Sequence, residues 1–175
     1  MNILVVVDMQ KDFIDGALGT GEAVAIVPGV VEKIRGFEGP VIATRDTHGA
    51  DYLETEEGRH LPVVHCVKDT PGWQLHPEVE EVVLAKAGSR IIDKPTFGSV
   101  DLGGYIRELD EKEPVEKITL IGLCTDICVI SNALLLKAYL PEVPVEVDIS
   151  CCAGVTPATH DQAAEAMKMC QIGIV

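Results

Sequence analysis

Six short apolar runs rich in β-branched residues recur along the chain, and they restrict its fold more than any other feature. The two clearest runs cover residues 3–7 and 118–121. Neither alternates apolar with polar residues, which is typical of strands that are covered on both faces, as in a parallel sheet. Four weaker runs cover residues 41–44, 90–92, 143–147 and 172–175.

Helical spacing fills the intervals between these runs. Val30, Ile34 and Phe37 follow one another at i, i+4 and i+7. Thr159 and Gln162 predict a capping box at the start of the last helix, with a start one turn earlier as the alternative. The repeated strand–helix–strand order predicts right-handed crossovers and an α/β fold, a three-layer doubly wound parallel sheet.

The length of the chain and one irregular interval define its domain organisation. A chain of 175 residues fits a single domain, residues 1–175, at about 150 residues per domain. The interval from 46 to 76 has little periodicity and contains several acidic and turn residues. A loop of this length inside a compact domain is typically functional, so we expect it to contribute to a site.

Charge and cysteine content exclude several classes of protein. Lys and Arg total 14 against 28 Asp and Glu, a net charge of −14, so no basic surface is available for nucleic acid or an anionic membrane. Polar residues interrupt the apolar stretch at 118–136, which fits a buried strand and helix better than a membrane span. The first run lacks the features of a signal peptide, which predicts a cytoplasmic location and free thiols for the six cysteines.

Nothing in the sequence indicates a nucleotide cofactor. Gly16, Gly19 and Gly21 follow the first run, but their spacing differs from that of G-x-G-x-x-G. No G-x-x-x-x-G-K-[ST] motif occurs in the chain. We therefore interpret these glycines as a turn before a helix.

Three reactive side chains lie where predicted strands end. Asp8 closes the first strand, Lys94 follows the run at 90–92, and Cys128 lies after the run at 118–121. Ligands of open parallel sheets bind at this edge. Cys128 is expected in the opening turn of a helix, where free N–H groups and a nearby Lys lower the pKa of a thiol. The three residues would then form a nucleophile, base and orienting group for acyl transfer.

Five motifs in fixed order identify the chain as similar to the isochorismatase-like cysteine hydrolases, and among these to the nicotinamidase/pyrazinamidase branch. The resemblance covers nearly the whole chain, and five ordered motifs are far more specific than any one of them. The motifs are V-V-V-D-M-Q-K-D-F (5–13), T-R-D-T-H (44–48), H-C-V (65–67), K-P-T-F (94–97) and G-L-C-T-D-I-C-V (122–129).

This resemblance implies a six-stranded sheet in the order 3-2-1-4-5-6 and a role for each reactive residue. Cys128 would attack a carboxamide carbon, Asp8 would act as base and then as proton donor, and Lys94 would stabilise the thiolate–carboxylate pair. It also implies a cis peptide between Leu123 and Cys124. The backbone amides of Cys124 and Cys128 would then form an oxyanion hole.

A second group of residues suggests a metal site. Asp46 and His48 are two apart on an extended segment, so their side chains share one face, and His65 would add a second imidazole. This set suits a catalytic divalent ion, with zinc preferred and iron or manganese as alternatives. The resemblance to nicotinamidases implies a fourth acidic or imidazole ligand from the long loop, and Glu57 is the candidate, ahead of Glu54 and His60. The alternative is that both histidines only brace the loop through hydrogen bonds.

Departures from the family pattern leave the substrate open. Nicotinamidases usually have an aromatic residue where this chain has Pro62. Phe13 and Phe97 are the candidate substrate-binding residues, and Trp73 is either a further ring contact or a loop anchor.

Three functions are therefore expected in order of preference. The first is a metal-assisted cysteine amidohydrolase that converts nicotinamide, or a similar small carboxamide, to the acid and ammonia through a thioester, with a place in NAD salvage. The second is a metal-independent C–N hydrolase of N-carbamoyl or ureido compounds. The third is a thiol redox sensor, although C-x-x-x-C is a poor match to C-x-x-C chemistry. The family resemblance also suggests a homo-oligomer.

Overall fold

The computed structural model describes all residues from 1 to 175 and contains one six-stranded sheet. Every strand pair is parallel, and the order is β3-β2-β1-β4-β5-β6, so the predicted fold class and strand order are confirmed. The strands are β1 (Asn2–Val7), β2 (Val41–Asp46), β3 (Arg90–Lys94), β4 (Lys117–Leu123), β5 (Val145–Ala153) and β6 (Gly173–Ile174).

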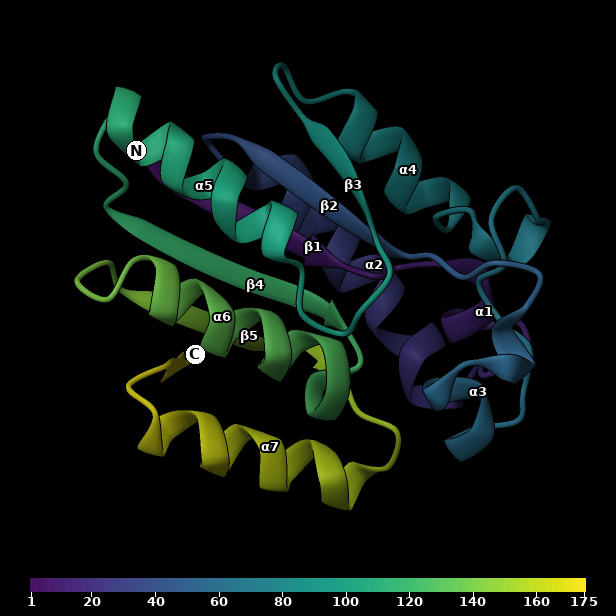
Figure 1. Ribbon diagram of the computed structural model, residues 1–175. Helices are drawn as coiled ribbons and strands as arrows, with labels where there is room; N and C mark the ends of the chain where they lie inside the picture. Colours follow the sequence, from purple (N-terminus) through teal and green to yellow (C-terminus); the bar gives the residue numbers. More distant parts are fainter.

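Helices cover both faces of this sheet and make the second and third layers (Figure 1). Helices α2 and α4 lie on one face and α5, α6 and α7 on the other, while α1 and α3 lie beyond the carboxyl ends of the strands. The helices are α1 (Lys11–Ile14), α2 (Gly21–Gly36), α3 (Glu56–His60), α4 (Pro77–Leu84), α5 (Val100–Lys112), α6 (Ile130–Tyr139) and α7 (Pro157–Met169). None of them is long and apolar enough to span a membrane.

The central strand β1 explains why the apolar runs do not alternate. Ile3, Val5 and Val7 pack with α5, α6 and α7 in one core cluster. Leu4 and Val6 pack with α2 and α4 in the other. All five side chains are fully buried, so each face of the strand is apolar and no position is left for a polar residue.

Several element boundaries differ from the sequence expectation because pairing extends through polar residues. Strand β2 continues to Asp46 and β3 to Lys94, with Arg45 opposite Asp93 in the register. The guanidinium of Arg45 lies 2.8 Å from the carboxylate of Asp93, which stabilises this polar end of the sheet. The interval from 46 to 76 contains the short helix α3 and two 3-10 turns, η1 (Tyr52–Glu54) and η2 (Pro71–Trp73), which its lack of periodicity conceals.

Helix α7 starts one turn earlier than the capping box of Thr159 and Gln162 predicts. Thr156 is the N-cap, and its hydroxyl accepts a hydrogen bond from the amide of Thr159 at 3.1 Å. The Thr159 hydroxyl in turn accepts from the amide of Thr156 at 3.1 Å, so the box is closed by a threonine in place of Glu or Gln. Pro157 at the first helical position fixes this start, because its ring presets φ and it has no N–H to satisfy.

We expect Thr156→Ala to lower the free energy of unfolding by about 1 kcal/mol, because the amide of Thr159 in the first turn loses its partner, the Thr156 hydroxyl. Urea unfolding followed by circular dichroism measures this loss. Glu165→Ala in the same helix is the control, since its exposed ion pair with Lys168 contributes little to stability. Equal unfolding midpoints for Thr156→Ala and the wild type would contradict the role of this cap.

Candidate active site

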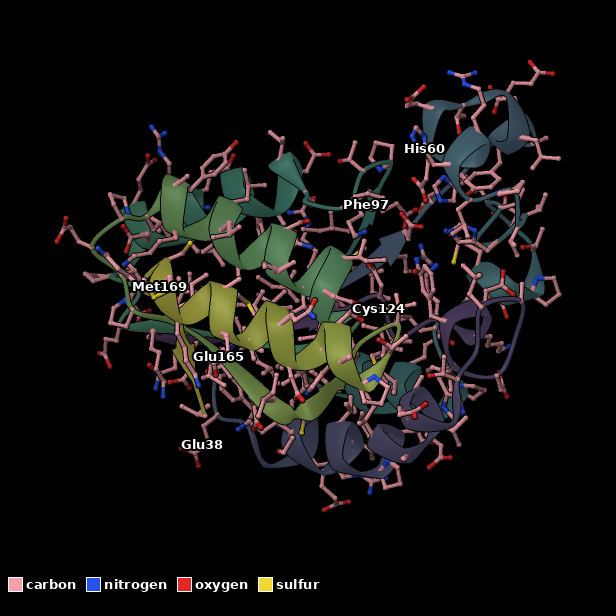
Figure 2. All side chains as sticks on the ribbon, turned by 90° about the horizontal axis from the view of Figure 1, so that it is seen from below. Glu38, His60, Phe97, Cys124, Glu165 and Met169 are labelled. Atoms are coloured by element: carbon pink, nitrogen blue, oxygen red, sulfur yellow. The ribbon has the colours of Figure 1, made fainter.

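The carboxyl edge of the sheet brings together the three reactive residues predicted from the sequence. Asp8 directly follows β1, Lys94 ends β3, and Cys128 lies in the turn after β4. Strand β1 pairs with β2 on one side and β4 on the other, and this is the point where the strand order reverses. In Figure 2 the labelled Phe97 and Cys124 lie at this end of the molecule, opposite Met169 and Glu165.

Lys94 connects Asp8 and Cys128 at the centre of the site. Its ammonium lies 2.6 Å from the Asp8 carboxylate and 3.4 Å from the Cys128 sulfur. The Thr44 hydroxyl donates to the other Asp8 oxygen at 2.6 Å, and the Lys94 ammonium also donates to the carbonyl of Thr96 at 3.1 Å. Asp8, Lys94 and Cys128 are all at most 4% exposed, so water screens these charges poorly.

Burial determines how these groups hold protons. It raises the pKa of the Asp8 carboxyl, against the opposing effect of the Lys94 ammonium. Burial and the nearby Asp8 also raise the pKa of the Cys128 thiol well above its usual value. The expectation that the turn and Lys94 lower the net pKa of this thiol is therefore wrong, because desolvation is the larger effect. A thiol with a raised pKa needs a base to become a nucleophile, and Asp8 is the carboxylate beside it.

The turn that carries Cys128 is a π-turn, Thr125–Val129, and not the opening turn of an α-helix. The carbonyl of Cys124 accepts hydrogen bonds from the amides of Ile127 at 3.1 Å and Val129 at 3.0 Å. The amide of Cys128, which lies between these two, is not among the donors to that carbonyl. The peptide bond between Leu123 and Cys124 is cis, as the family resemblance implies.

Four side chains that can hold a metal ion gather next to this centre. One donor atom from each of Asp46, His48, Glu57 and His65 lies within 4.8 Å of the others. Nε2 of His48 is 2.8 Å and Nε2 of His65 is 3.6 Å from the same Asp46 oxygen. The structure thus places Glu57 in the group. It leaves out Glu54 and His60, and the His60 ring is exposed and hydrogen-bonded to its own helix.

The donor set fits a divalent cation. Asp46 Oδ1 and His48 Nε2 are buried and lack a hydrogen bond of adequate geometry, although the Lys94 ammonium lies 3.5 Å from the first atom and Asp46 Oδ2 lies 2.8 Å from the second. Nδ1 of His65 lies 2.8 Å from the Val63 carbonyl, which leaves Nε2 as the lone-pair nitrogen that faces the carboxylates. Burial and the nearby Asp46 raise the pKa of Glu57, as expected for carboxylates gathered without a cation. If the two histidines only braced the loop through hydrogen bonds, the His65 contact with Val63 would be explained. The missing hydrogen bonds of Asp46 Oδ1 and His48 Nε2 would not be explained.

A cavity of about 750 Å³ opens over both groups. Phe13 and Phe97 line it, as predicted, and Phe97 is 43% exposed at its rim. Trp73 is a loop anchor: its indole N–H donates to the Thr47 hydroxyl at 2.9 Å, and its ring lies under Arg45. The other lining residues include Leu18, Thr20, His60, Leu61, Thr96, Cys124, Ile127, Cys128 and Val155.

Sequence reasoning missed three buried residues that hold the site in place. The Gln10 side chain accepts from the Asp46 amide at 2.7 Å and donates to the carbonyls of Asp46 and Trp73 at 2.8 Å each. Tyr52 is 1% exposed and packs its ring against both His48 and His65. Of the three, only Gln10 could have been found from the sequence, since it lies within the first family motif. The third residue, Asn132, is treated below.

The fold and this edge define an α/β protein with a cysteine-centred site at the switch point of a parallel sheet. The isochorismatase domain model matches residues 2–174, so the chain belongs to that family. This confirms the resemblance drawn from the five motifs.

Relatives and solved structures of the nicotinamidase/pyrazinamidase branch match the chain over its length. A nicotinamidase/pyrazinamidase of Mycobacterium tuberculosis is 28% identical over 187 residues, covering 100% of this chain and 98% of the relative. The crystal structure of a pyrazinamidase of Pyrococcus horikoshii in complex with zinc superimposes with a TM-score of 0.82 at 29% identity, covering 99% and 98%. A nicotinamidase/pyrazinamidase of Bacillus subtilis has a TM-score of 0.83 at 24% identity, covers 98% of each chain and supports the fold.

Proposed function

We propose that this protein is a metal-assisted cysteine amidohydrolase that converts nicotinamide, or a similar small carboxamide, to the acid and ammonia through a thioester. The coarser prediction, a hydrolase of non-peptide C–N bonds, is confirmed by the family match and by the nicotinamidases among the relatives. The observation that carries the proposal is the chain of contacts from Asp8 through Lys94 to the Cys128 sulfur beneath an open cavity.

In the first step, Asp8 takes the proton of the Cys128 thiol as the sulfur attacks the carboxamide carbon. A carbon–sulfur bond forms, and the carbonyl becomes an oxyanion. The Lys94 ammonium stabilises negative charge on both the carboxylate and the sulfur, since it lies close to each. The raised pKa of Asp8 helps it to hold this proton until the next step.

The amides of Cys124 and Cys128 are the proposed donors to the oxyanion. The carbonyl of Cys124 accepts hydrogen bonds from the amides of Ile127 and Val129. The amide of Cys128 does not donate to that carbonyl. As the intermediate collapses, the C–N bond breaks and Asp8 returns its proton to the departing ammonia. Asp8 then activates a water that hydrolyses the thioester and restores the thiol.

Asp46, His48, His65 and Glu57 are the proposed ligands of a divalent metal. Two imidazoles and two carboxylates favour zinc, with iron or manganese as alternatives, and the zinc in the Pyrococcus horikoshii pyrazinamidase supports this choice. A bound ion would supply a Lewis-acidic position for the ring nitrogen of the substrate or for water. Phe13 and Phe97 would hold the ring of the substrate between them.

The buried environment of the Cys124 thiol disfavours the third function, a thiol redox sensor. Burial raises the pKa of the Cys124 thiol to about 12, which leaves very little of the thiolate that disulfide exchange requires. The remaining expectations, a cytoplasmic homo-oligomer that binds no nucleic acid and acts in NAD salvage, stay predictions.

The direct test of the substrate is ammonia release from three compounds: nicotinamide, benzamide and an N-carbamoyl amino acid. We expect nicotinamide to be hydrolysed fastest, because benzamide lacks the ring nitrogen that a metal would hold. Ammonia from the N-carbamoyl compound alone would favour the second function. No release from any of the three would overturn the proposal.

Direct metal binding tests the four proposed ligands separately from catalysis. Chelator-treated protein, supplied with zinc and then desalted, should retain one equivalent per chain by elemental analysis. His65→Ala should retain much less of that metal after desalting, because it removes one of the four proposed ligands. His60→Ala is the control and should retain the full equivalent, because His60 lies outside the group. Wild-type protein without bound metal would contradict the assignment.

A further inference from the structure

Asn132 lies in the first turn of α6, one turn after Cys128, and it is completely buried. Its side-chain amide donates to the carbonyl of Cys128 at 2.8 Å and to the carbonyl of Phe97 at 3.1 Å. Its side-chain oxygen accepts the amide of Ser99 at 2.9 Å. The orientation of the amide is fixed, because two carbonyls require a donor and an N–H requires an acceptor.

These three hydrogen bonds join the turn that carries Cys128 to the loop that contains Phe97 and Ser99. The Cys128 carbonyl belongs to the turn that carries the sulfur. Phe97 and Ser99 belong to the loop between β3 and α5, which begins directly after Lys94 and forms one wall of the cavity. The two backbones also approach closely at Gly98, where an added Cβ would lie 3.2 Å from the carbonyl of Ser131. Asn132 is therefore a buried cross-link between the thiol and the loop anchored at Lys94.

We propose that Asn132 is a positioning residue, whose amide fixes the Cys128 turn against the Phe97–Ser99 loop and so holds the sulfur within reach of Lys94. A sulfur–ammonium separation of 3.4 Å leaves little room for movement before the interaction weakens. A misplacement of about 1 Å costs on the order of a hundredfold in rate. The bonds to Cys128 and Ser99 are buried, so their loss is not replaced by water, while the bond to Phe97 is partly buried. The effect on turnover rests on the proposed function, whereas the effect on thiol reactivity does not.

Two substitutions remove different parts of the cross-link. Asn132→Asp keeps the shape of the side chain and the acceptor for Ser99, but it cannot donate to both carbonyls. Asn132→Thr adds no charge, and its hydroxyl can still donate to the Cys128 carbonyl four residues back, as the Ser131 hydroxyl donates to Ile127 at 2.6 Å. It loses the bonds to Phe97 and Ser99.

The test is the rate at which iodoacetamide alkylates Cys128, followed by peptide mapping so that the other cysteines are counted separately. We expect both variants to alkylate Cys128 about tenfold or more slowly than the wild type. With nicotinamide as substrate, kcat should fall about 10- to 100-fold, and by a larger factor than KM rises, since the sulfur acts in the chemical step while Phe97 would contact only the ring of the substrate. Thr119→Val is the control for general destabilisation. It removes a buried hydroxyl that bonds only Glu146, far from the cavity, and should alkylate at the wild-type rate.

Alkylation of Cys128 within twofold of the wild-type rate in either folded variant would overturn the inference. Failure of both variants to fold would overturn it too, because Asn132 would then serve folding and not positioning. If wild-type protein releases no ammonia from any amide, the proposed function fails, and alkylation still decides the role of Asn132.

Discussion

We expect replacement of Cys128 by alanine to abolish the proposed release of ammonia from nicotinamide, with kcat lowered more than about a thousandfold. The reason is that the alanine has no sulfur to form the proposed thioester, while Asp8, Lys94 and the four proposed metal ligands keep their positions. Steady-state ammonia release measures the loss. The variant should still bind zinc in one equivalent, since Cys128 is not among the four proposed ligands.

Cys152→Ala is the matched control for this substitution. Cys152 is a buried thiol on β5, it is outside the cavity lining, and its substitution by alanine removes the same sulfur atom. We expect it to be less stable than the wild type but to retain turnover. If Cys128→Ala keeps wild-type turnover, the nucleophile has been assigned to the wrong residue.

Asp8→Asn should lower kcat by about a hundredfold to ten-thousandfold, the usual range for the loss of a general base. The amide has nearly the shape of the carboxylate but cannot take the thiol proton, and the raised pKa of Cys128 makes that transfer necessary. Asp148→Asn is the control, because it also removes a carboxylate paired with a lysine, 2.7 Å from Lys33, at a place away from the cavity. It should turn over at the wild-type rate.

The pH profile separates loss of the base from simple loss of an ion pair. In the wild type the base must be unprotonated, so kcat/KM falls as pH drops through the pKa of Asp8. Burial raises that pKa, which places the fall above the usual carboxyl range. In Asp8→Asn the remaining activity should lack this acid limb. An unchanged acid limb in the variant would assign it to another group.

The sheet and the reacting centre were predictable because their signals are local in the sequence. An apolar run buried on both faces indicates a central parallel strand before any partner is known, and Asp8 and Cys128 follow such runs, whereas Lys94 ends the partly exposed edge strand β3. Asp46 and His48 share a face through a spacing of two residues. The motif order then supplied the strand order, which spacing alone does not determine.

The remaining parts of the site depend on contacts between segments far apart in the chain. Asn132 bonds to Phe97 and Ser99, more than 30 residues earlier, and nothing near it in the sequence marks that partnership. Tyr52 lies in the irregular interval from 46 to 76 with no local signal, and only the folded chain shows its ring packed against both His48 and His65. The direction of the Cys128 pKa was also wrong in advance, because desolvation depends on burial that only the folded chain reveals.

The central claim is a thioester on Cys128, and partitioning with hydroxylamine tests it most directly. Nicotinamide and the methyl ester of nicotinic acid carry the same acyl group on different leaving groups. If both pass through one acyl-enzyme, added hydroxylamine should divide each between acid and hydroxamate in the same ratio. The account predicts equal ratios for the two substrates. Ratios that differ with the leaving group, or turnover without hydroxamate, would contradict it.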